Sequence, residues 1–340
     1  MRPARCKSGK RFNAQLSCFR LPSMSDLSPS VDERDGRSVF VSAPDGLRLH
    51  VQEYGPAAAP ALSVVCLPGL ARTTADFGAL APALAFTEPR RRVIAIDSRG
   101  RGQSAYDPDQ QHYNPSVELA DVVAVLIARE IKRAVFIGSS RGGILTMLLA
   151  AAHPELIAGA VLHDIGPVIE SEGVARIKSY VGKLPQPQDW QEGADILCAL
   201  FAVQFPKLTA EQWLGAARRT WKLQSGKLVL TYDPALAETL ADFDIEHPLP
   251  SLWNEFDALA RAPVLVIRGA RSDILSAATL NAMRARHPGL ESIEVADQGH
   301  VPLLEGADLI QRVAVFVEKC ERAAQPQKPK NHKNSTELAP

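Results

Sequence analysis

The sequence predicts an α/β fold: a doubly wound, mostly parallel sheet of eight strands with an inserted helical cap. Short apolar runs alternate with helical patterns along most of the 340-residue chain, as in repeated β-α-β units. The alternation stops between about residues 168 and 250, where only helical patterns occur. Polar segments rich in glycine follow the apolar runs, at the end of the strands where such sheets bind ligands.

The expected strands are short, and most are apolar throughout, as strands buried on both faces of a sheet are. The first two instead alternate apolar and polar residues around Asp45-Gly46, which predicts a hairpin. In chain order the expected strands are residues 38–42, 47–54, 62–66, 93–96, 134–137, 159–162, 263–268 and 292–296.

Helical patterns separate these strands. One helix is expected to be capped by Ser116 and to carry an apolar stripe from Leu119 to Ile127. Another is expected to be capped by Ser276. Further helices are expected at 76–84, 144–152 and around the apolar face of 309–317, and within the insertion at 174–181, 190–201 and 211–223.

These patterns divide the chain into a core of residues 31–167 and 251–322 and a helical cap of residues 168–250. Residues 1–30 are expected to form a flexible basic segment. Its first 23 residues are expected to be either a transit-like leader or a stretch that is not translated because synthesis starts at Met24. Residues 323–340 are polar and rich in Lys and Pro, and are expected to be a disordered tail.

The composition excludes several classes of partner. There are 38 basic and 38 acidic residues, so no charge excess for nucleic acid exists. The sequence contains no run of 18 apolar residues, so no membrane span is predicted. The five scattered cysteines are expected to be free thiols in a cytoplasmic protein. We find no metal-ligand spacing, phosphate loop or dinucleotide fingerprint, and expect no cofactor or metal. A monomer and a homodimer are equally compatible with the sequence.

The segment Gly138-Ser139-Ser140-Arg141-Gly142 lies between an expected strand and an expected helix. That context gives a G-x-S-x-G match its meaning, because glycine on both sides removes Cβ clashes in a very sharp turn. The central Ser140 is therefore expected to project from the edge of the sheet, at the positive end of a helix dipole.

A serine hydroxyl needs a neighbouring base, and the base needs an orienting acid. His300 follows the last expected strand, and Asp273 follows the strand before it. The chain order Ser, Asp, His fits this architecture. Asp164 is the alternative acid, because it also ends a strand, next to the turn that holds Ser140.

The sequence resembles the α/β-hydrolase superfamily, in its capped branch with a serine nucleophile. The resemblance covers residues 38–320 and rests on LPGL, DSRGRGQS, GSSRGG, GARSDILS and DQGHVPLLE, each after an expected strand. It implies that Ser140 is the nucleophile and that His300 is the general base. It further implies that Asp273 orients His300 and that the backbone N–H groups of Leu70 and Arg141 form the oxyanion hole.

The resemblance implies a hydrolase that cleaves a small or medium carboxylic ester through an acyl-enzyme. A lactone, an amide or a C–C bond is an alternative target of the same residues, and a ligand receptor or cofactor-free perhydrolase is an alternative class. Arg141 stands where many relatives have Met or Leu. It either forms a salt bridge with a nearby acid or, with Arg72, favours an acidic substrate.

Overall fold

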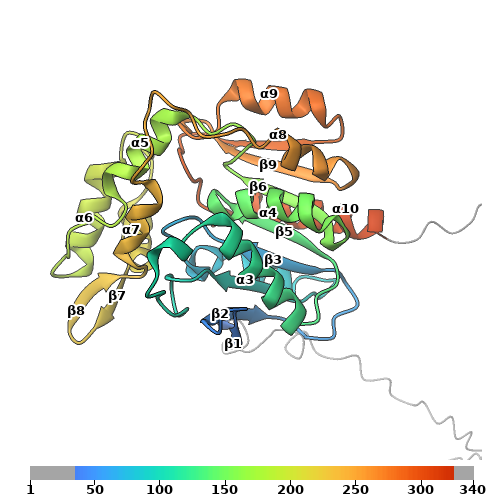
Figure 1. The fold of residues 1–340 in the computed structure, drawn as a ribbon, viewed down its shortest axis with the longest axis horizontal. Helices are drawn as coiled ribbons and strands as arrows, with labels where there is room; N and C mark the ends of the chain where they lie inside the picture. Colours follow the sequence, from blue (N-terminus) through green and yellow to red (C-terminus); the bar gives the residue numbers. More distant parts are fainter. Residues whose placement is uncertain (1–34, 325–340) are drawn as a thin grey trace, which may run out of the picture.

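The structure is a computed structural model that describes residues 35–324. An eight-stranded sheet in the order β1-β2-β4-β3-β5-β6-β9-β10 forms its centre (Figure 1). Neighbouring strands are parallel, except that β2 is antiparallel to both β1 and β4. The strands are β1 (Arg37–Ser42), β2 (Arg48–Tyr54), β3 (Ser63–Leu67), β4 (Val93–Asp97), β5 (Ala134–Ser139), β6 (Ile157–His163), β9 (Val264–Gly269) and β10 (Glu291–Val295).

Helices cover both faces of the sheet, which confirms the predicted doubly wound class. One face packs against α3 (Pro115–Ala128), α4 (Arg141–Ala152), α8 (Trp253–Asp257) and α9 (Ala277–Arg286). The other packs against α2 (Leu80–Phe86) and α10 (Ala307–Ala324). Short 3-10 helices at η2 (Thr74–Phe77), η3 (Gln110–His112), η4 (Pro154–Leu156) and η6 (Ala258–Arg261) complete the connections. The expected segment 1–30 and nearly all of the expected tail lie outside the described residues.

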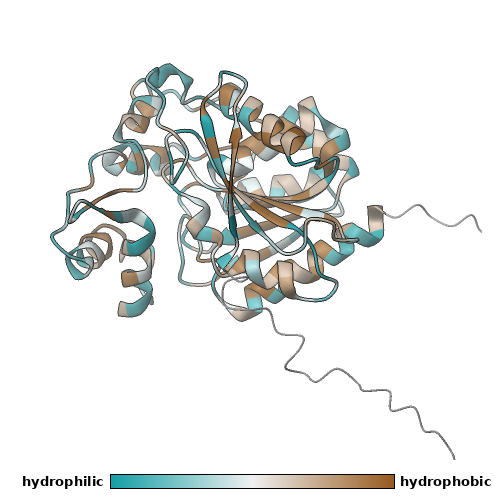
Figure 2. Cartoon of the chain, turned by 90° about the horizontal axis from the view of Figure 1, so that it is seen from below, coloured by the Kyte–Doolittle hydropathy of each residue, from teal (hydrophilic) through white to brown (hydrophobic). Residues whose placement is uncertain are grey.

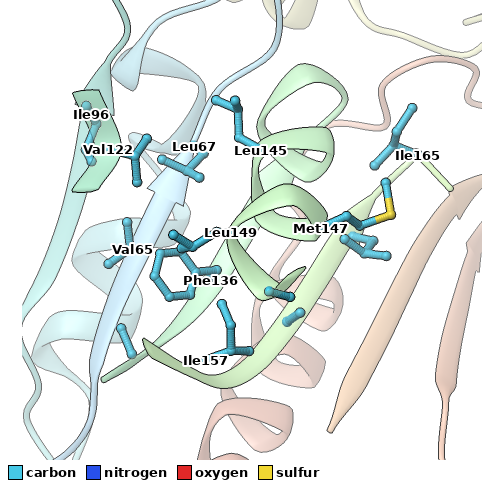
Figure 3. Packing of buried hydrophobic residues seen from close by; sticks show 14 of the residues in the cluster. Val65, Leu67, Ile96, Val122, Phe136, Leu145, Met147, Leu149, Ile157 and Ile165 are labelled. Carbon is cyan, nitrogen blue, oxygen red and sulfur yellow. The ribbon is translucent and has the colours of Figure 1, made fainter. Parts of the chain in front are cut away.

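Two apolar layers hold the helices to the sheet. Along β3, Val65 and Leu67 face the α4 layer, whereas Val64 and Cys66 face the α2 and α10 layer, as the two-residue period of a strand requires. Figure 3 shows Val65, Leu67 and Phe136 close to Leu149 of α4. Burying a side chain of this size contributes about 1.5–3 kcal/mol. In Figure 2 the strands are largely brown and the outer helix faces teal.

A separate group of elements lies beyond the carboxyl ends of the strands (Figure 1). In the chain this group is inserted between β6 and β9. It contains α5 (Ser171–Tyr180), α6 (Trp190–Phe201), α7 (Ala210–Thr220), the hairpin strands β7 (Trp221–Gln224) and β8 (Lys227–Leu230), and η5 (Pro234–Leu240). Its own apolar cluster includes Trp213 and Trp221.

The expected helix at 211–223 is wrong beyond Thr220. Trp221 starts β7 instead, and its buried indole joins the apolar cluster of the insertion. Ser225 and Gly226 form the turn with positive φ angles of 49° and 77°. Two consecutive residues with positive φ match the twist of a two-stranded hairpin. The sequence signal for this hairpin was the pair Ser-Gly between two segments that alternate apolar and polar residues.

Of the two helix caps predicted from the sequence, one is confirmed and one is wrong. Ser276 caps α9, and its Oγ accepts the N–H of Thr279 at 3.1 Å. Ser116 does not cap α3. The side-chain oxygen of Asn114 accepts the N–H groups of Ser116 and Val117 at 3.0 and 3.1 Å, and Pro115 occupies the first helical position. Between residues 35 and 324, no helix is long and apolar enough to cross a membrane.

Glu53 of β2 joins three parts of the core. Its carboxylate accepts hydrogen bonds from Arg92 at 2.6 Å, Arg129 at 2.7 Å and Arg37 at 2.7 Å. Burial alone raises the pKa of Glu53, but the hydrogen bonds from the arginines outweigh it and lower this pKa to about 2. The ion cluster therefore ties β2 to the start of β4 and the end of α3.

We predict that Glu53→Gln lowers the free energy of unfolding at pH 7 by roughly 3–5 kcal/mol, the usual effect of breaking a buried ion pair. Because the folded-state pKa is depressed, the contribution is complete above about pH 4.5 and is lost as pH falls towards 2. Urea unfolding of both proteins across this range should show the difference shrinking. A difference that does not depend on pH contradicts this account.

Candidate active site

Ser140 occupies a strained turn between β5 and α4. Its φ and ψ are 48° and −110°, a conformation rare for a residue with a side chain. A Cβ on Gly138 would strike the carbonyl of Gly142, and a Cβ on Gly142 would strike the carbonyl of Leu67. The two flanking glycines are therefore required by close backbone contacts, as predicted.

His300 lies against Ser140. Its Nε2 is 2.8 Å from Ser140 Oγ, although 160 residues separate them in sequence. The histidine comes from the loop after β10, and its side chain is only 6% exposed. The backbone N–H of Ser140 donates to the carbonyl of His163 at the end of β6, which fixes the turn on the neighbouring strand. The structure thus brings together the predicted nucleophile and the predicted base.

Asp164, not Asp273, meets the other side of the His300 ring. Nδ1 of His300 is 2.8 Å from Asp164 Oδ2. The carboxylate of Asp164 is fully buried and accepts two further hydrogen bonds, from the N–H of Gly269 at 2.7 Å and from Ser272 Oγ at 2.6 Å. Three donors therefore fix the orientation of this carboxylate and, through it, the orientation of the imidazole.

The prediction that Asp273 contacts His300 is wrong. Asp273 pairs with Arg176 of α5, whose Nη2 is 2.8 Å from Asp273 Oδ1. Burial raises the pKa of Asp273, but the hydrogen bonds and charge of Arg176 outweigh it and lower this pKa. Ser272, one residue earlier, is the side chain that this loop directs towards the site. The sequence signal for Asp164 was its place after β6, the strand beside β5.

His163 precedes Asp164 and is also buried, with Nδ1 3.0 Å from Ser139 Oγ. Burial lowers the pKa of His163 to about 4. The ring is therefore neutral near pH 7 and does not compete with His300 as a cation beside Asp164.

The residues expected to form the oxyanion hole lie on either side of the Ser140 turn. Arg141 is the first residue of α4, where backbone N–H groups have no intrahelical acceptor. Leu70 lies in the loop after β3 and lines the same cavity as Ser140. Neither N–H donates to a backbone carbonyl within residues 35–324. Their role as donors to an oxyanion stays a prediction.

A cavity of about 1200 Å³, part of it open to solvent, lies between the sheet and the insertion. Ser140 and His300 form part of its floor. Its opposite wall is mostly apolar and comes from the insertion: Leu184, Leu197, Phe201, Phe205, Leu208 and Trp213. Such a pocket binds the apolar part of a small molecule and excludes water from the reacting atoms.

A family model described as the alpha/beta hydrolase fold matches residues 63–307, which include Ser140, Asp164 and His300. The chain belongs to this family. A 3-hydroxybutyrate-oligomer hydrolase from Cupriavidus necator is 34% identical over 271 residues, 76% of this chain and 89% of that protein. A 2-(acetamidomethylene)succinate hydrolase from Mesorhizobium japonicum is 27% identical over 67% of this chain and 78% of that protein. The structure of an alpha/beta hydrolase from Novosphingobium aromaticivorans aligns with a TM-score of 0.78 and 40% identity, and covers 84% of this chain and 99% of that one.

The charged residues of this α/β-hydrolase that line the cavity are paired. Arg72 binds Asp76 at 2.5 Å, and Arg219 of α7 binds Glu305 at 2.6 Å. Arg141 does not line the cavity, and its Nε is 2.7 Å from Glu118. Of the two interpretations of Arg141, the structure therefore supports the salt bridge, and the two cavity arginines bring no net positive charge.

One group of side chains in the described part of this α/β-hydrolase has the spacing of metal ligands. Asp45, Asp107 and His112 bring ligand atoms within 4.8 Å of one another. Nη1 of Arg99 already binds both carboxylates, at 2.9 Å from Asp45 and 2.5 Å from Asp107. A guanidinium thus stands where a cation would bind, and the group fits a structural ion cluster.

We predict that Asp164→Asn slows the labelling of Ser140 by a fluorophosphonate by about 10³–10⁴-fold, because an amide no longer holds the reactive tautomer of His300. Asp273→Asn is the matched control, since it removes the other candidate carboxylate and leaves all three contacts of Asp164 intact. Its labelling rate should stay within about tenfold of the wild type. The reverse order of the two variants contradicts the assignment. The measurement is the second-order labelling rate by intact-protein mass.

Proposed function

We propose that this protein is a serine hydrolase that cleaves small or medium carboxylic esters through an acyl-enzyme. The observation that carries the proposal is the unbroken chain of hydrogen bonds from Asp164 through His300 to Ser140, at the floor of a largely apolar cavity. A nucleophile, a base and an orienting acid in this arrangement are the requirements of acyl transfer.

In the first half of the reaction, Ser140 Oγ attacks the ester carbonyl while His300 Nε2 takes the hydroxyl proton. The charge that develops on the carbonyl oxygen is stabilised by the N–H groups of Leu70 and Arg141. Removing a single donor of this kind typically costs about 10²–10³ in turnover. His300 then returns the proton to the leaving alcohol, and the acyl group remains on Ser140.

In the second half, water replaces the alcohol and the same steps free the acid. Asp164 stays a carboxylate throughout and stabilises the imidazolium form of His300. Its hydrogen bonds from Gly269 and Ser272 keep it aimed at Nδ1 during both halves. The burial of His300 and Asp164 keeps bulk water from competing for these hydrogen bonds.

The cavity and the relatives together suggest the substrate class. The apolar wall from the insertion suits an aliphatic acyl or alcohol part, and the paired charges of the cavity suit a substrate without a large net charge. The relative from Cupriavidus necator is named for an oligomer of 3-hydroxybutyrate, a short chain of ester bonds. We therefore propose short esters of aliphatic or hydroxy acids as substrates.

We predict that Ser140→Ala abolishes both ester hydrolysis and fluorophosphonate labelling, because no other hydroxyl lies against His300 Nε2 among the hydrogen bonds of residues 35–324. Ser139→Ala is the control, since Ser139 is adjacent but bonds to His163. That variant should keep turnover within about tenfold. If Ser140→Ala retains steady-state turnover comparable to that of the wild type, the proposal is wrong.

A second prediction concerns chain length. Among p-nitrophenyl esters, kcat/KM should be highest for acyl chains between acetyl and octanoyl and should fall for palmitoyl, because the cavity is bounded by the insertion. The methyl esters of 3-hydroxybutyrate dimer and trimer should be cleaved at rates comparable to the best of these. Initial rates by titration of released acid test this, and no turnover of any ester in the panel would falsify the proposed chemistry.

A further inference from the structure

A buried cluster of three charged side chains lies outside the cavity, beneath the Ser140 turn. Glu118 of α3 forms an ion pair with Arg101 on one side, with Nη1 2.8 Å from Oε1. On the other side its Oε2 accepts a hydrogen bond from Nε of Arg141 at 2.7 Å. The side chains of Arg101 and Glu118 are at most 1% exposed, and that of Arg141 is 15% exposed. Two guanidinium groups therefore share one carboxylate in the interior.

A buried cluster of this kind is weak evidence for a stabilising role. Buried ion pairs lose much of their attraction to desolvation, and apolar replacements of similar volume are often equally stable or more stable. Burial raises the pKa of Glu118, but the two arginines outweigh it and lower this pKa. The carboxylate is therefore ionised near pH 7, and the cluster carries a net positive charge. A costly arrangement of this kind suggests that the positions of its members matter.

The cluster touches the residues that carry both expected oxyanion donors. Arg141 is the residue after Ser140, and its backbone N–H is one donor. Leu70 carries the other, and Nε of Arg101 donates to the carbonyl oxygen of Leu70 at 2.7 Å. Nη1 of Arg101 also donates to the carbonyl of Arg99 at 2.7 Å, which anchors this guanidinium to its own loop. Glu118 thus lies at the junction of two connections, one to each side of the expected oxyanion hole.

We propose that Glu118 is a positioning residue that sets the spacing of the Leu70 and Arg141 N–H groups through Arg101 and Arg141; this rests on the proposed acyl-transfer function. Arg141 then has a physical reason to be charged, because Met or Leu at this position cannot pair with Glu118. Glu118 touches no substrate, since it does not line the cavity. Its effect belongs to the transition state, where the oxyanion exists, and not to substrate binding.

The test compares two variants on the same helix. Glu118→Gln removes the shared charge of the cluster. Asp121→Asn, one turn further along α3, removes an equally buried carboxylate that binds Arg99 at 2.7 Å and contacts neither Leu70 nor Arg141. For both we would measure kcat and KM on a p-nitrophenyl ester, thermal unfolding, and inhibition by an alkyl trifluoromethyl ketone, which forms an oxyanion adduct with serine.

We expect Glu118→Gln to lower kcat by about 10–100-fold with KM changed less than about threefold, and to weaken the trifluoromethyl ketone by a similar factor. Asp121→Asn should unfold at a comparably lowered temperature and keep kcat within about threefold. Equal losses of kcat in the two variants, or a loss of kcat without weaker inhibition, overturn the proposal. Because the wild type serves as the reference in each assay, these outcomes differ from the absence of ester turnover that refutes the proposed function.

Arg141→Met provides a second route if Glu118→Gln does not fold, because it leaves Arg101 and Glu118 as a neutral pair. This variant should lower kcat and weaken inhibition by the trifluoromethyl ketone by a similar factor, although the backbone N–H of residue 141 is still present. Where both single variants fold, the double variant should lose less kcat than the product of the two single effects, since Glu118 acts partly through Arg141. A fully multiplicative loss, or an unchanged kcat in Arg141→Met, contradicts the proposal.

Discussion

The hydrogen bond between Asp164 and His300 is the contact on which the site depends. His300 arrives from beyond β10, two strands away from β6 in the sheet, and needs a fixed partner at the centre. Asp164 provides it from the end of β6, directly beside the strand that leads into Ser140. The register of β5 with β6 therefore sets the distance between Ser140 and Asp164, and the imidazole of His300 spans it.

The remaining charges near the site are arranged so that they do not disturb this contact. His163 is kept neutral by burial, Asp273 is held by Arg176, and Glu118 is held by two arginines. The ion pair of Arg219 with Glu305 joins the insertion to the loop after β10, close to His300 in the chain. The apolar wall of the cavity faces a floor that includes Ser140 and His300.

Much of the core could be predicted from the sequence, because buried parallel strands are apolar throughout and the Ser140 turn needs glycine at fixed positions. The carboxylate that contacts His300 could not be predicted from the sequence, because Asp164 and Asp273 both follow strands and both satisfy the expected chain order. What separates them is a contact from the insertion, Arg176 with Asp273, and long-range pairs of this kind leave no local pattern. The hairpin at β7 and β8 was missed since its Trp and Leu residues also fit a helical stripe, and the partner of Arg141 lies 23 residues earlier.

The measurement that tests the central claim most directly is proton NMR of the His300 ring. A nitrogen-bound proton held between Nδ1 and a buried carboxylate gives a resonance far downfield of the amide region. The account predicts this resonance in the wild type and in Asp273→Asn, and its loss in Asp164→Asn and His300→Gln. Its persistence in Asp164→Asn, or its loss in Asp273→Asn, would contradict the assignment of Asp164 as the partner of His300.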